Sequence, residues 1–147
     1  MMPERATSPT AGKAGFRGYI SSRPINGDRT PQHVQNLVIR DYARRKGLAF
    51  KLSATEYAMP GCYLMLDGVL DEIDRIEGII AYSLFMLPSQ PARRRAVMAR
   101  VLAAGCTLHA AVEEYCVAGP KDVEWAENVW RLNEALGRAP KHLPENL

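Results

Sequence analysis

The chain has 147 residues, of which 47% are hydrophobic and 24% charged, a length and balance typical of one globular domain. This size excludes an enzyme that carries a separate cofactor-binding domain. No apolar run reaches the ~20 residues that a membrane-spanning helix needs, which predicts a cytoplasmic protein without membrane contact. Residues 1–15 lack the apolar stretch of a signal peptide, so we expect a disordered leader there. A single α/β domain should follow over residues 16–138, with a frayed tail over 139–147.

Charge is unevenly distributed along the chain. The net charge of +3 divides into +6 for residues 1–112, with 15 basic and 9 acidic residues, and −3 for residues 113–147, with 4 basic and 7 acidic residues. Because a nucleic-acid-binding tail is normally basic, this distribution argues against nucleic acid as a partner. The three cysteines, Cys62, Cys106 and Cys116, fit no zinc pattern, and no cofactor motif is present. We therefore predict reduced thiols, no metal and no cofactor.

Short strands and amphipathic helices alternate along the chain. Phe16–Ser21 is a strand candidate, and the polar loop Ser22–Arg29 follows it. A helix should then begin with Thr30 as N-cap and Pro31 at its first position. That helix should end at Gly47, because glycine suits a left-handed C-cap.

The later elements follow from the periods of strands and helices. Gly78–Leu84 is a nearly continuous apolar run, which is typical of a central parallel strand. Gly105 and Gly137 should close the third and fourth helices. The elements expected after Gly47 are a strand over Leu48–Ser53, a helix over Tyr63–Arg75, the strand Gly78–Leu84, a helix from Pro91 to Ala104, a strand over Cys106–Val112 and a helix over Asp122–Leu136.

Four strand–helix repeats with short loops predict an α/β fold. The fold class is an open, mostly parallel, four-stranded sheet with helices on both faces, in three layers. In such sheets ligands bind beyond the carboxyl ends of the strands. This rule selects four loops that carry hydroxyl, carboxylate and arginine side chains: Ser21–Arg29, Ser53–Gly61, Ser83–Pro91 and Glu113–Gly119.

Two of these loops contain the main candidates for chemistry. Arg23 and Arg29 flank a turn before a helix N-terminus, whose dipole favours an anion, so we predict a phosphate or carboxylate site there. Alternatively, one arginine pairs with Asp28 on the surface. Glu56 is a candidate general acid or base, because its apolar neighbours would raise the pKa of its carboxyl. Its alternative role is to cap the next helix or to pair with an arginine.

Other candidates also keep two interpretations. His109 lies in an apolar strand, where a lone histidine either acts on a ligand or is hydrogen-bonded in the core. Ser21 is either a nucleophile or a cap for backbone groups. Arg93–Arg95 form a solvated helix face or an interface, with nucleic acid as a lesser alternative. The predicted catalytic residues are Glu56, Tyr57, Tyr82, His109 and Ser21, and the predicted substrate-binding residues are Arg17, Tyr19, Ser22, Arg23, Arg29, Ser53, Thr55 and Ser83.

Four segments carry a resemblance to a known family. They cover residues 17–24, 31–42, 52–63 and 81–88, and the third reads Leu-Ser-Ala-Thr-Glu-Tyr-Ala-Met-Pro-Gly-Cys-Tyr. Together they resemble the small bacterial family called sporadic carbohydrate cluster proteins, over roughly residues 16–115. The resemblance implies a role in polysaccharide or unusual-sugar biosynthesis, in a biosynthetic gene cluster, and assigns no chemistry.

A second resemblance is to the catalytic domain of serine recombinases, which share a strand with Y-x-R-x-S and a later L-D-R-L-x-R segment. Here the first pattern becomes Tyr19-Ile20-Ser21-Ser22-Arg23, in which arginine and serine exchange order. The second becomes Ser83-Leu84-Phe85-Met86-Leu87-Pro88, without the aspartate and the arginines. The recombinase active site is not reproduced, so this resemblance implies only the fold, a resolvase-like three-layer sandwich with the flavodoxin-like one as the alternative.

These observations predict a carbohydrate-biosynthesis protein, with an enzyme favoured, that acts on a phosphorylated or nucleotide-linked sugar by acid–base or group-transfer chemistry. In this hypothesis Arg23 and Arg29 hold the anionic group and Glu56 moves a proton. One alternative is a non-catalytic subunit that docks on a larger sugar-modifying enzyme through Arg93–Arg95 and the last helix. The third is a recombinase-like DNA-binding protein, which the acidic C-terminal segment argues against. We also expect a homo-oligomer.

Overall fold

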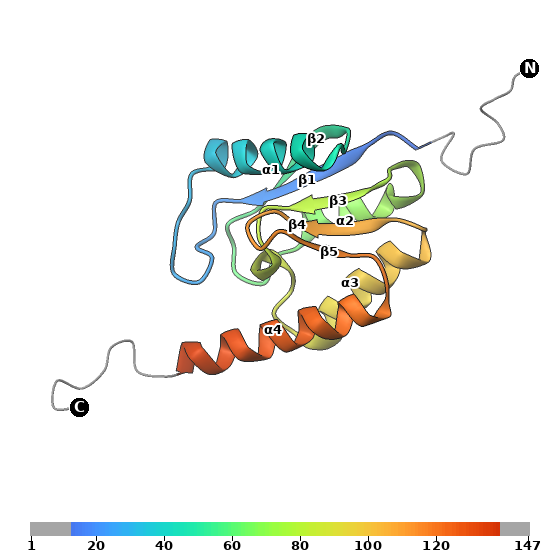
Figure 1. The fold of residues 1–147 in the computed structure, drawn as a ribbon. Coiled ribbons are helices and arrows are strands. Elements are labelled where there is room, and N and C mark those ends of the chain that lie inside the picture. Colours follow the sequence, from blue (N-terminus) through green and yellow to red (C-terminus); the bar gives the residue numbers. More distant parts are fainter. Residues whose placement is uncertain (1–12, 139–147) are drawn as a thin grey trace, which may run out of the picture.

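The computed structural model describes residues 13–138, over which strands and helices alternate (Figure 1). The tail expected over 139–147 lies outside this range, as does the leader expected over 1–15 except for its last three residues. Within the described range, no helix is both long and apolar enough to cross a membrane. The elements are β1 (Phe16–Ser21), α1 (Gln32–Lys46), β2 (Phe50–Glu56), α2 (Leu64–Asp71), β3 (Gly78–Ala81), α3 (Pro91–Ala103), β4 (Thr107–Ala110), β5 (Tyr115–Val117) and α4 (Pro120–Arg138), with short 3₁₀ turns at Ile73–Arg75 and Leu84–Met86.

The strands form one sheet in the order β2-β1-β3-β4-β5. β1 pairs in parallel with β2 and β3, β3 pairs in parallel with β4, and β5 runs antiparallel to β4. The predicted α/β class and mostly parallel sheet are therefore confirmed, with five strands in place of four. The sequence pattern missed β5 because three residues are too few to show a period of two. It forms because Glu114, with a φ of 52°, turns the chain back so that Tyr115 pairs with Ala110.

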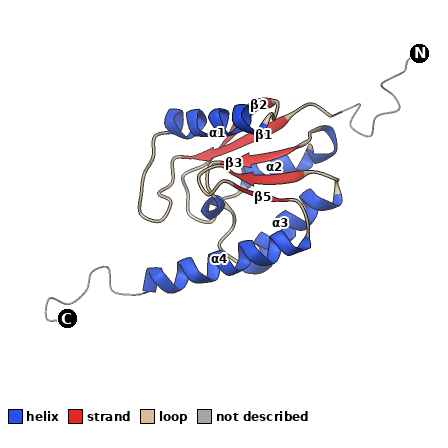
Figure 2. Ribbon diagram, viewed as in Figure 1, coloured by secondary structure: helices blue, strands red, loops and turns tan. Residues whose placement is uncertain are grey.

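Helices cover both faces of the sheet, as predicted (Figure 2). α1 packs alone on one face, where its Ile39 and Tyr42 cluster with Phe16 and Ile20 of β1. α2, α3 and α4 share the other face, and Tyr19 of β1 belongs to the larger core cluster there. β3 is buried along its whole length, which is the central position that its apolar sequence predicts.

Some element ends differ from the sequence prediction. Thr30 does not cap α1, because Pro31 occupies the N-cap position and no side chain caps the helix. Gly47 does end α1 in the left-handed conformation, with a φ of 71°. The second helix ends at Asp71 and continues only as a 3₁₀ turn. α4 runs through Gly137, since a helix tolerates a glycine at a cost of about 1 kcal/mol.

A buried ion pair holds α3 against α4. Arg94 is 1% exposed, and its Nε and Nη2 donate to the two carboxylate oxygens of Glu127 at 2.6 and 2.7 Å. Its Nη1 donates to the carbonyls of Pro88 and Ser89, and its guanidinium carbon lies 4.2 Å from the centroid of the Trp130 ring. The prediction that Arg94 faces solvent is therefore wrong. Successive helix residues point about 100° apart, so three consecutive arginines cannot share one face.

Removing one partner of this pair should leave an uncompensated charge in the core. We expect Arg94→Met to lower the free energy of unfolding by about 3–5 kcal/mol, measured by urea denaturation. The double variant Arg94→Met/Glu127→Leu removes both charges and should recover most of the loss. Equal destabilisation of the single and double variants would show that the pair does not stabilise the α3–α4 junction.

Candidate functional site

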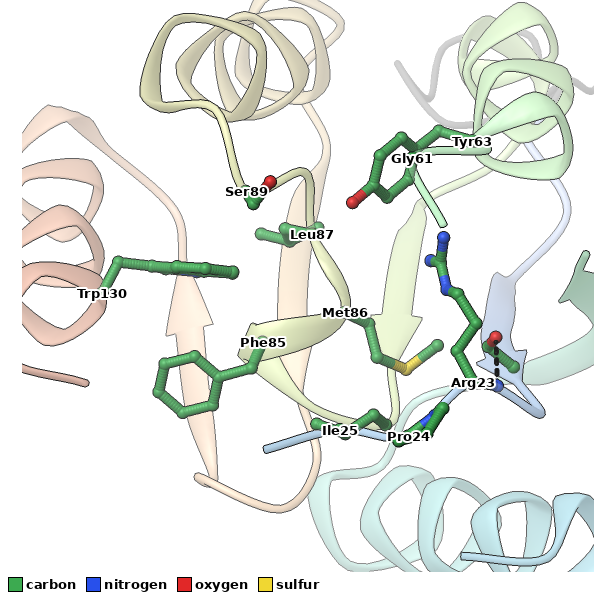
Figure 3. Close-up of a pocket in the computed structure, with 11 residues that line it drawn as sticks. Arg23, Pro24, Ile25, Gly61, Tyr63, Phe85, Met86, Leu87, Ser89 and Trp130 are labelled. Atoms are coloured by element: carbon green, nitrogen blue, oxygen red, sulfur yellow. Dashed lines mark hydrogen bonds between the residues drawn. The ribbon is translucent and has the colours of Figure 1, made fainter. Parts of the chain in front are cut away.

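The first cavity of interest lies between the carboxyl ends of β1 and β3. The chain leaves β1 for β2 on one side and then crosses to β3 on the other, so α1 and α2 lie on opposite faces and a crevice opens between the strand ends. A cavity of about 190 Å³ occupies this position (Figure 3). We name it the switch-point pocket, and it is lined by Ser21, Arg23, Pro24, Ile25, Gly61, Tyr63, Phe85, Met86, Leu87, Ser89 and Trp130.

Arg23 is the cation of the switch-point pocket, and its side chain extends towards Tyr63 (Figure 3). Its Nη1 donates to the carbonyl of Cys62 at 2.9 Å, and its guanidinium carbon lies 4.8 Å from the centroid of the Tyr63 ring. Between residues 13 and 138 it has no carboxylate partner, so the pairing with Asp28 is not found. A guanidinium has five N–H donors, and Arg23 therefore keeps donors for an anion.

Gln35 of α1 fixes the loop that carries Arg23. The Gln35 side chain is fully buried, and its Oε1 accepts a hydrogen bond from the backbone N–H of Ser21 at 3.1 Å. Its Nε2 donates to the carbonyls of Ser21 and Thr30 at 2.6 and 2.8 Å. The Ser21 hydroxyl in turn accepts from the backbone N–H of Arg23 at 3.0 Å. These bonds hold both ends of the loop and set the direction in which Arg23 leaves β1.

A second arginine, Arg93 of α3, lies against the same tyrosine. Its guanidinium carbon is also 4.8 Å from the Tyr63 ring centroid, and its contact with Asp67 is long, at 3.5 Å, and exposed. Tyr63 is therefore flanked by two cations. Arg93 lines a smaller hollow of about 110 Å³, the α3 pocket, together with Gly61, Tyr63, Pro88, Ser89 and Gln90.

A third cavity, of about 170 Å³, adjoins the switch-point pocket, because Ile25 and Phe85 line both. Two carboxylates, Asp28 and Glu113, give it the opposite charge, and Glu113 accepts a hydrogen bond from the Ser83 hydroxyl at 2.8 Å. We name it the acidic pocket. Its lining consists of Ile25, Asn26, Asp28, Thr30, Tyr82, Ser83, Phe85, Val112 and Glu113.

A wider hollow of about 410 Å³, the α1 pocket, meets the acidic pocket at Thr30. It is lined by Ser22, Arg29, Thr30, Pro31, Gln32 and His33. The four hollows thus form a row in the order α3 pocket, switch-point pocket, acidic pocket and α1 pocket, in which neighbours share lining residues. We name this row the edge groove. It contains six predicted site residues, although not in a single pocket: Ser21, Ser22, Arg23, Arg29, Tyr82 and Ser83.

Glu56 is buried at the end of β2 and anchors the start of α2. Its Oε1 accepts from the Tyr19 hydroxyl at 2.7 Å and the Leu66 N–H at 3.1 Å. Its Oε2 accepts from the N–H groups of Met65 and Tyr57, both at 3.1 Å. The carboxylate thus satisfies free amides at the start of α2, as a helix cap does. Burial and the hydrogen bond to Glu56 raise the pKa of Tyr19 far above its ordinary value.

His109 lies in the core on the α1 side of the sheet. Its Nδ1 is 2.7 Å from the Tyr42 hydroxyl, and its Nε2 is 2.9 Å from the Thr107 hydroxyl. Burial, and to a smaller extent the charge of Lys46, lowers the pKa of His109 to about 4. The ring is therefore neutral near pH 7, and both of its nitrogens have partners within the protein.

Four other predicted site residues lie outside the edge groove. Arg17 forms an ion pair with Glu72 at 2.7 Å, near the opposite end of β1. Ser53 donates a hydrogen bond to a side chain of α1, and Thr55 is exposed on β2. Tyr57 is 54% exposed and lines none of the four hollows. Across residues 13–138, no group of three potential metal-ligating side chains is found.

Two residues of the groove, Tyr63 and Ser89, were not among the predicted site residues, and Arg93 was expected only as part of a solvated helix face or an interface, with nucleic acid as a lesser alternative. A signal for Arg93 was present, because arginines in the first turn of a helix oppose its dipole and therefore need another reason to be there. No comparable signal joins Tyr63 to the two arginines. Arg23 lies in the loop after β1, Tyr63 directly before α2 and Arg93 in α3, and only the sheet topology brings them together.

The comparisons with known proteins concern the fold. No family model matches the chain, and no curated protein matches it. A solved structure of a resolvase family site-specific recombinase from Streptococcus pneumoniae is similar with a TM-score of 0.60 and 10% identity, over 84% of this chain and 91% of that one. The N-terminal catalytic domain of TP901-1 integrase is similar with a TM-score of 0.57 and 14% identity, over 82% of this chain and 95% of that one. This chain therefore has the fold of recombinase catalytic domains.

These findings correct the functional prediction from sequence. The predicted role in carbohydrate biosynthesis is wrong, because the solved structures that share the fold are a recombinase and an integrase domain, and no family model supports the sugar-cluster family. The sugar substrate and the sugar-modifying partner enzyme are wrong for the same reason. The exclusion of nucleic acid is overturned by the likeness to a site-specific recombinase. The second resemblance, to the serine recombinase fold, is confirmed.

His109 should make stability depend on pH. The pKa of its imidazole falls from an ordinary value of 6.5 to about 4 in the folded protein, so between these values the unfolded chain binds a proton that the folded chain does not. Stability contributed by the neutral ring is therefore lost as the pH falls through this range. We expect a loss on the order of 3 kcal/mol from about pH 7 to about pH 4. The variant His109→Gln should lose less over the same range in urea denaturation, and equal losses would contradict this assignment.

Glu56→Gln should weaken the anchor of α2. An amide side chain has one acceptor oxygen and brings an NH₂ group against the donors that the carboxylate satisfied. We expect the free energy of unfolding to fall by about 1–3 kcal/mol in chemical denaturation. Asp74→Asn, an exposed carboxylate change, is the control and should alter stability by less than about 0.5 kcal/mol. If both variants were as stable as the wild type, the anchoring role would be refuted.

Proposed function

We propose that this protein is a cytoplasmic nucleic-acid-binding protein that holds the phosphate backbone of a strand in the edge groove. The observation that carries the proposal is the pair Arg23 and Arg93, which lie against one tyrosine at the switch point and keep N–H donors free. Guanidinium groups suit phosphate because their planar donors match its oxygens. The fold likeness to a site-specific recombinase, a protein that acts on DNA, supports this class of ligand.

The two hollows beside Tyr63 are smaller than sites that enclose a compact organic ligand, and their sizes suit a phosphate group of a strand. The switch-point and α3 pockets have volumes of about 190 and 110 Å³, whereas sites that enclose a small organic ligand have about 300–1,000 Å³. A phosphate group fills only a few water volumes of about 30 Å³ each, so it fits either hollow. The rest of a strand would continue along the groove towards Arg29, the cation of the α1 pocket.

The acidic C-terminal segment repels a polyanion less than its composition suggests. Glu127 is buried against Arg94, and Glu124 pairs with Arg95 at 2.6 Å. Two of the carboxylates counted in the sequence are therefore neutralised by arginines of α3. A count of charged residues along the chain cannot include such pairing, because the partners lie on different helices.

Ser21 has a positioning role in this proposal. It is 1% exposed, and its hydroxyl accepts the backbone N–H of Arg23. The bond turns the chain so that the Arg23 side chain enters the switch-point pocket. Binding of phosphate then depends on the arginines, with Ser21 and Gln35 supporting the loop from below.

Loss of either arginine should weaken binding to a short single-stranded DNA. Arg23→Ala and Arg93→Ala each remove a charged hydrogen-bond donor, so we expect each to raise Kd by about 5- to 10-fold. Each should also reduce the slope of log Kd against log salt by about 0.7, because one phosphate contact is lost. Fluorescence anisotropy over a series of salt concentrations measures both quantities.

Arg100→Ala is the matched control for these variants. Arg100 is on the same helix as Arg93, is exposed, and pairs with Asp71 outside the edge groove. We expect its Kd and salt slope to stay close to those of the wild type. The proposal fails if the wild type does not bind the strand, or if Arg100→Ala weakens binding as much as the other two variants do.

A further inference from the structure

We propose that the acidic pocket receives an unpaired nucleobase that presents N–H donors, and that guanine fits it best. This inference rests on the proposed function, because it names the part of a bound strand that lies next to the phosphate-binding arginines. It concerns a different pocket and different residues. A measurement that overturns this inference can therefore leave the proposed function intact.

The position of the acidic pocket in the edge groove matches the order of groups along a nucleic acid strand. The pocket shares Ile25 and Phe85 with the switch-point pocket, which contains Arg23. It shares Thr30 with the α1 pocket, which contains Arg29. A base in a strand likewise lies between two phosphates. The groove therefore presents cation, carboxylate and cation where a strand presents phosphate, base and phosphate.

The polar groups of the acidic pocket are mainly hydrogen-bond acceptors. Over residues 13–138, the Asp28 side chain has no hydrogen-bond or ion-pair partner, and only its backbone groups pair with Ile25. Glu113 accepts bonds from Ser83 and Leu84, one at each carboxylate oxygen, and each oxygen has a second lone pair. Two carboxylates repel a phosphate and attract N–H groups, so this hollow suits a base rather than the backbone.

The remaining lining provides surfaces for a flat aromatic ring. Tyr82 and Phe85 are half-buried in the lining, and Val112 is 50% exposed. Unpaired bases stack on aromatic side chains with about 1–3 kcal/mol per base. The Tyr82 hydroxyl lies 3.4 Å from the Thr30 hydroxyl, which is a long contact that leaves both groups able to bond a ligand.

The N–H donors that each base presents determine which base fits the acidic pocket. Guanine presents its N1–H and its amino group side by side and can give two parallel hydrogen bonds to one carboxylate. Cytosine and adenine each present an amino group. Thymine presents a single N–H between two carbonyl oxygens, which a carboxylate repels. In a duplex these edges are paired, so the pocket requires an unpaired base.

The test compares a short thymidine strand with the same strand carrying one central guanosine. By fluorescence anisotropy, the wild type should bind the guanosine strand about 5- to 100-fold more tightly, the range expected for a bidentate base contact. Asp28→Asn should remove most of this ratio. Asp74→Asn, which changes an exposed carboxylate outside the edge groove, should keep it. The readout is the ratio of the affinities for the two strands, because the loss of a negative charge strengthens the binding of both strands alike.

The outcomes separate this inference from the proposed function. Equal affinity for the two strands, with binding still weakened by Arg23→Ala, overturns the base pocket and leaves the phosphate groove intact. A duplex bound as tightly as the guanosine strand also overturns it, as does an unchanged ratio in a folded Asp28→Asn protein. If neither strand binds, both the proposed function and this inference fail.

Discussion

The parallel pairing of β1 with both β2 and β3 is the constraint on which the rest of the structure depends. Because these strands run in the same direction, the chain leaves each of them at one edge and returns through a helix. The loops after β1, β2 and β3 therefore reach the edge where Arg23, Tyr63 and Ser89 meet. Since β1 lies between β2 and β3, α1 and α2 cover opposite faces, and the crevice between them becomes the switch-point pocket.

Buried polar side chains then fix the loops at that edge. Gln35, Glu56 and Arg94 are each at most 2% exposed, and each bonds to backbone groups of a loop or a helix start. A buried polar group that loses its partner costs about 1–3 kcal/mol, so these side chains tolerate few other loop conformations. The edge groove therefore has rigid supports. Two of its arginines, Arg23 and Arg93, are held against Tyr63 while part of each guanidinium stays available to a ligand.

The segment over residues 52–63, which carries the resemblance to the sugar-cluster family, has an architectural role here. Glu56 anchors α2, Gly61 has a φ of 76°, and the Cys62 carbonyl accepts a hydrogen bond from Arg23. These are requirements of a strand–helix loop in this fold, and such requirements do not specify a substrate. A distinctive string thus led to a wrong function, whereas the strand pattern shared with serine recombinases indicated the correct fold.

The sequence by itself determined the α/β class, the central position of β3 and the end of α1 at Gly47, because periodicity and left-handed glycine are local properties. It also placed Arg23, Tyr82 and Ser83 at the carboxyl ends of strands. Only the tertiary structure decided which candidates meet: Arg23 joins Tyr63 and Arg93, which come from distant parts of the chain, while Glu56, Arg94 and His109 turn inward. The reason is physical. Such contacts depend on strand order and on where each buried polar group finds its partner, and neither is recorded in a local pattern.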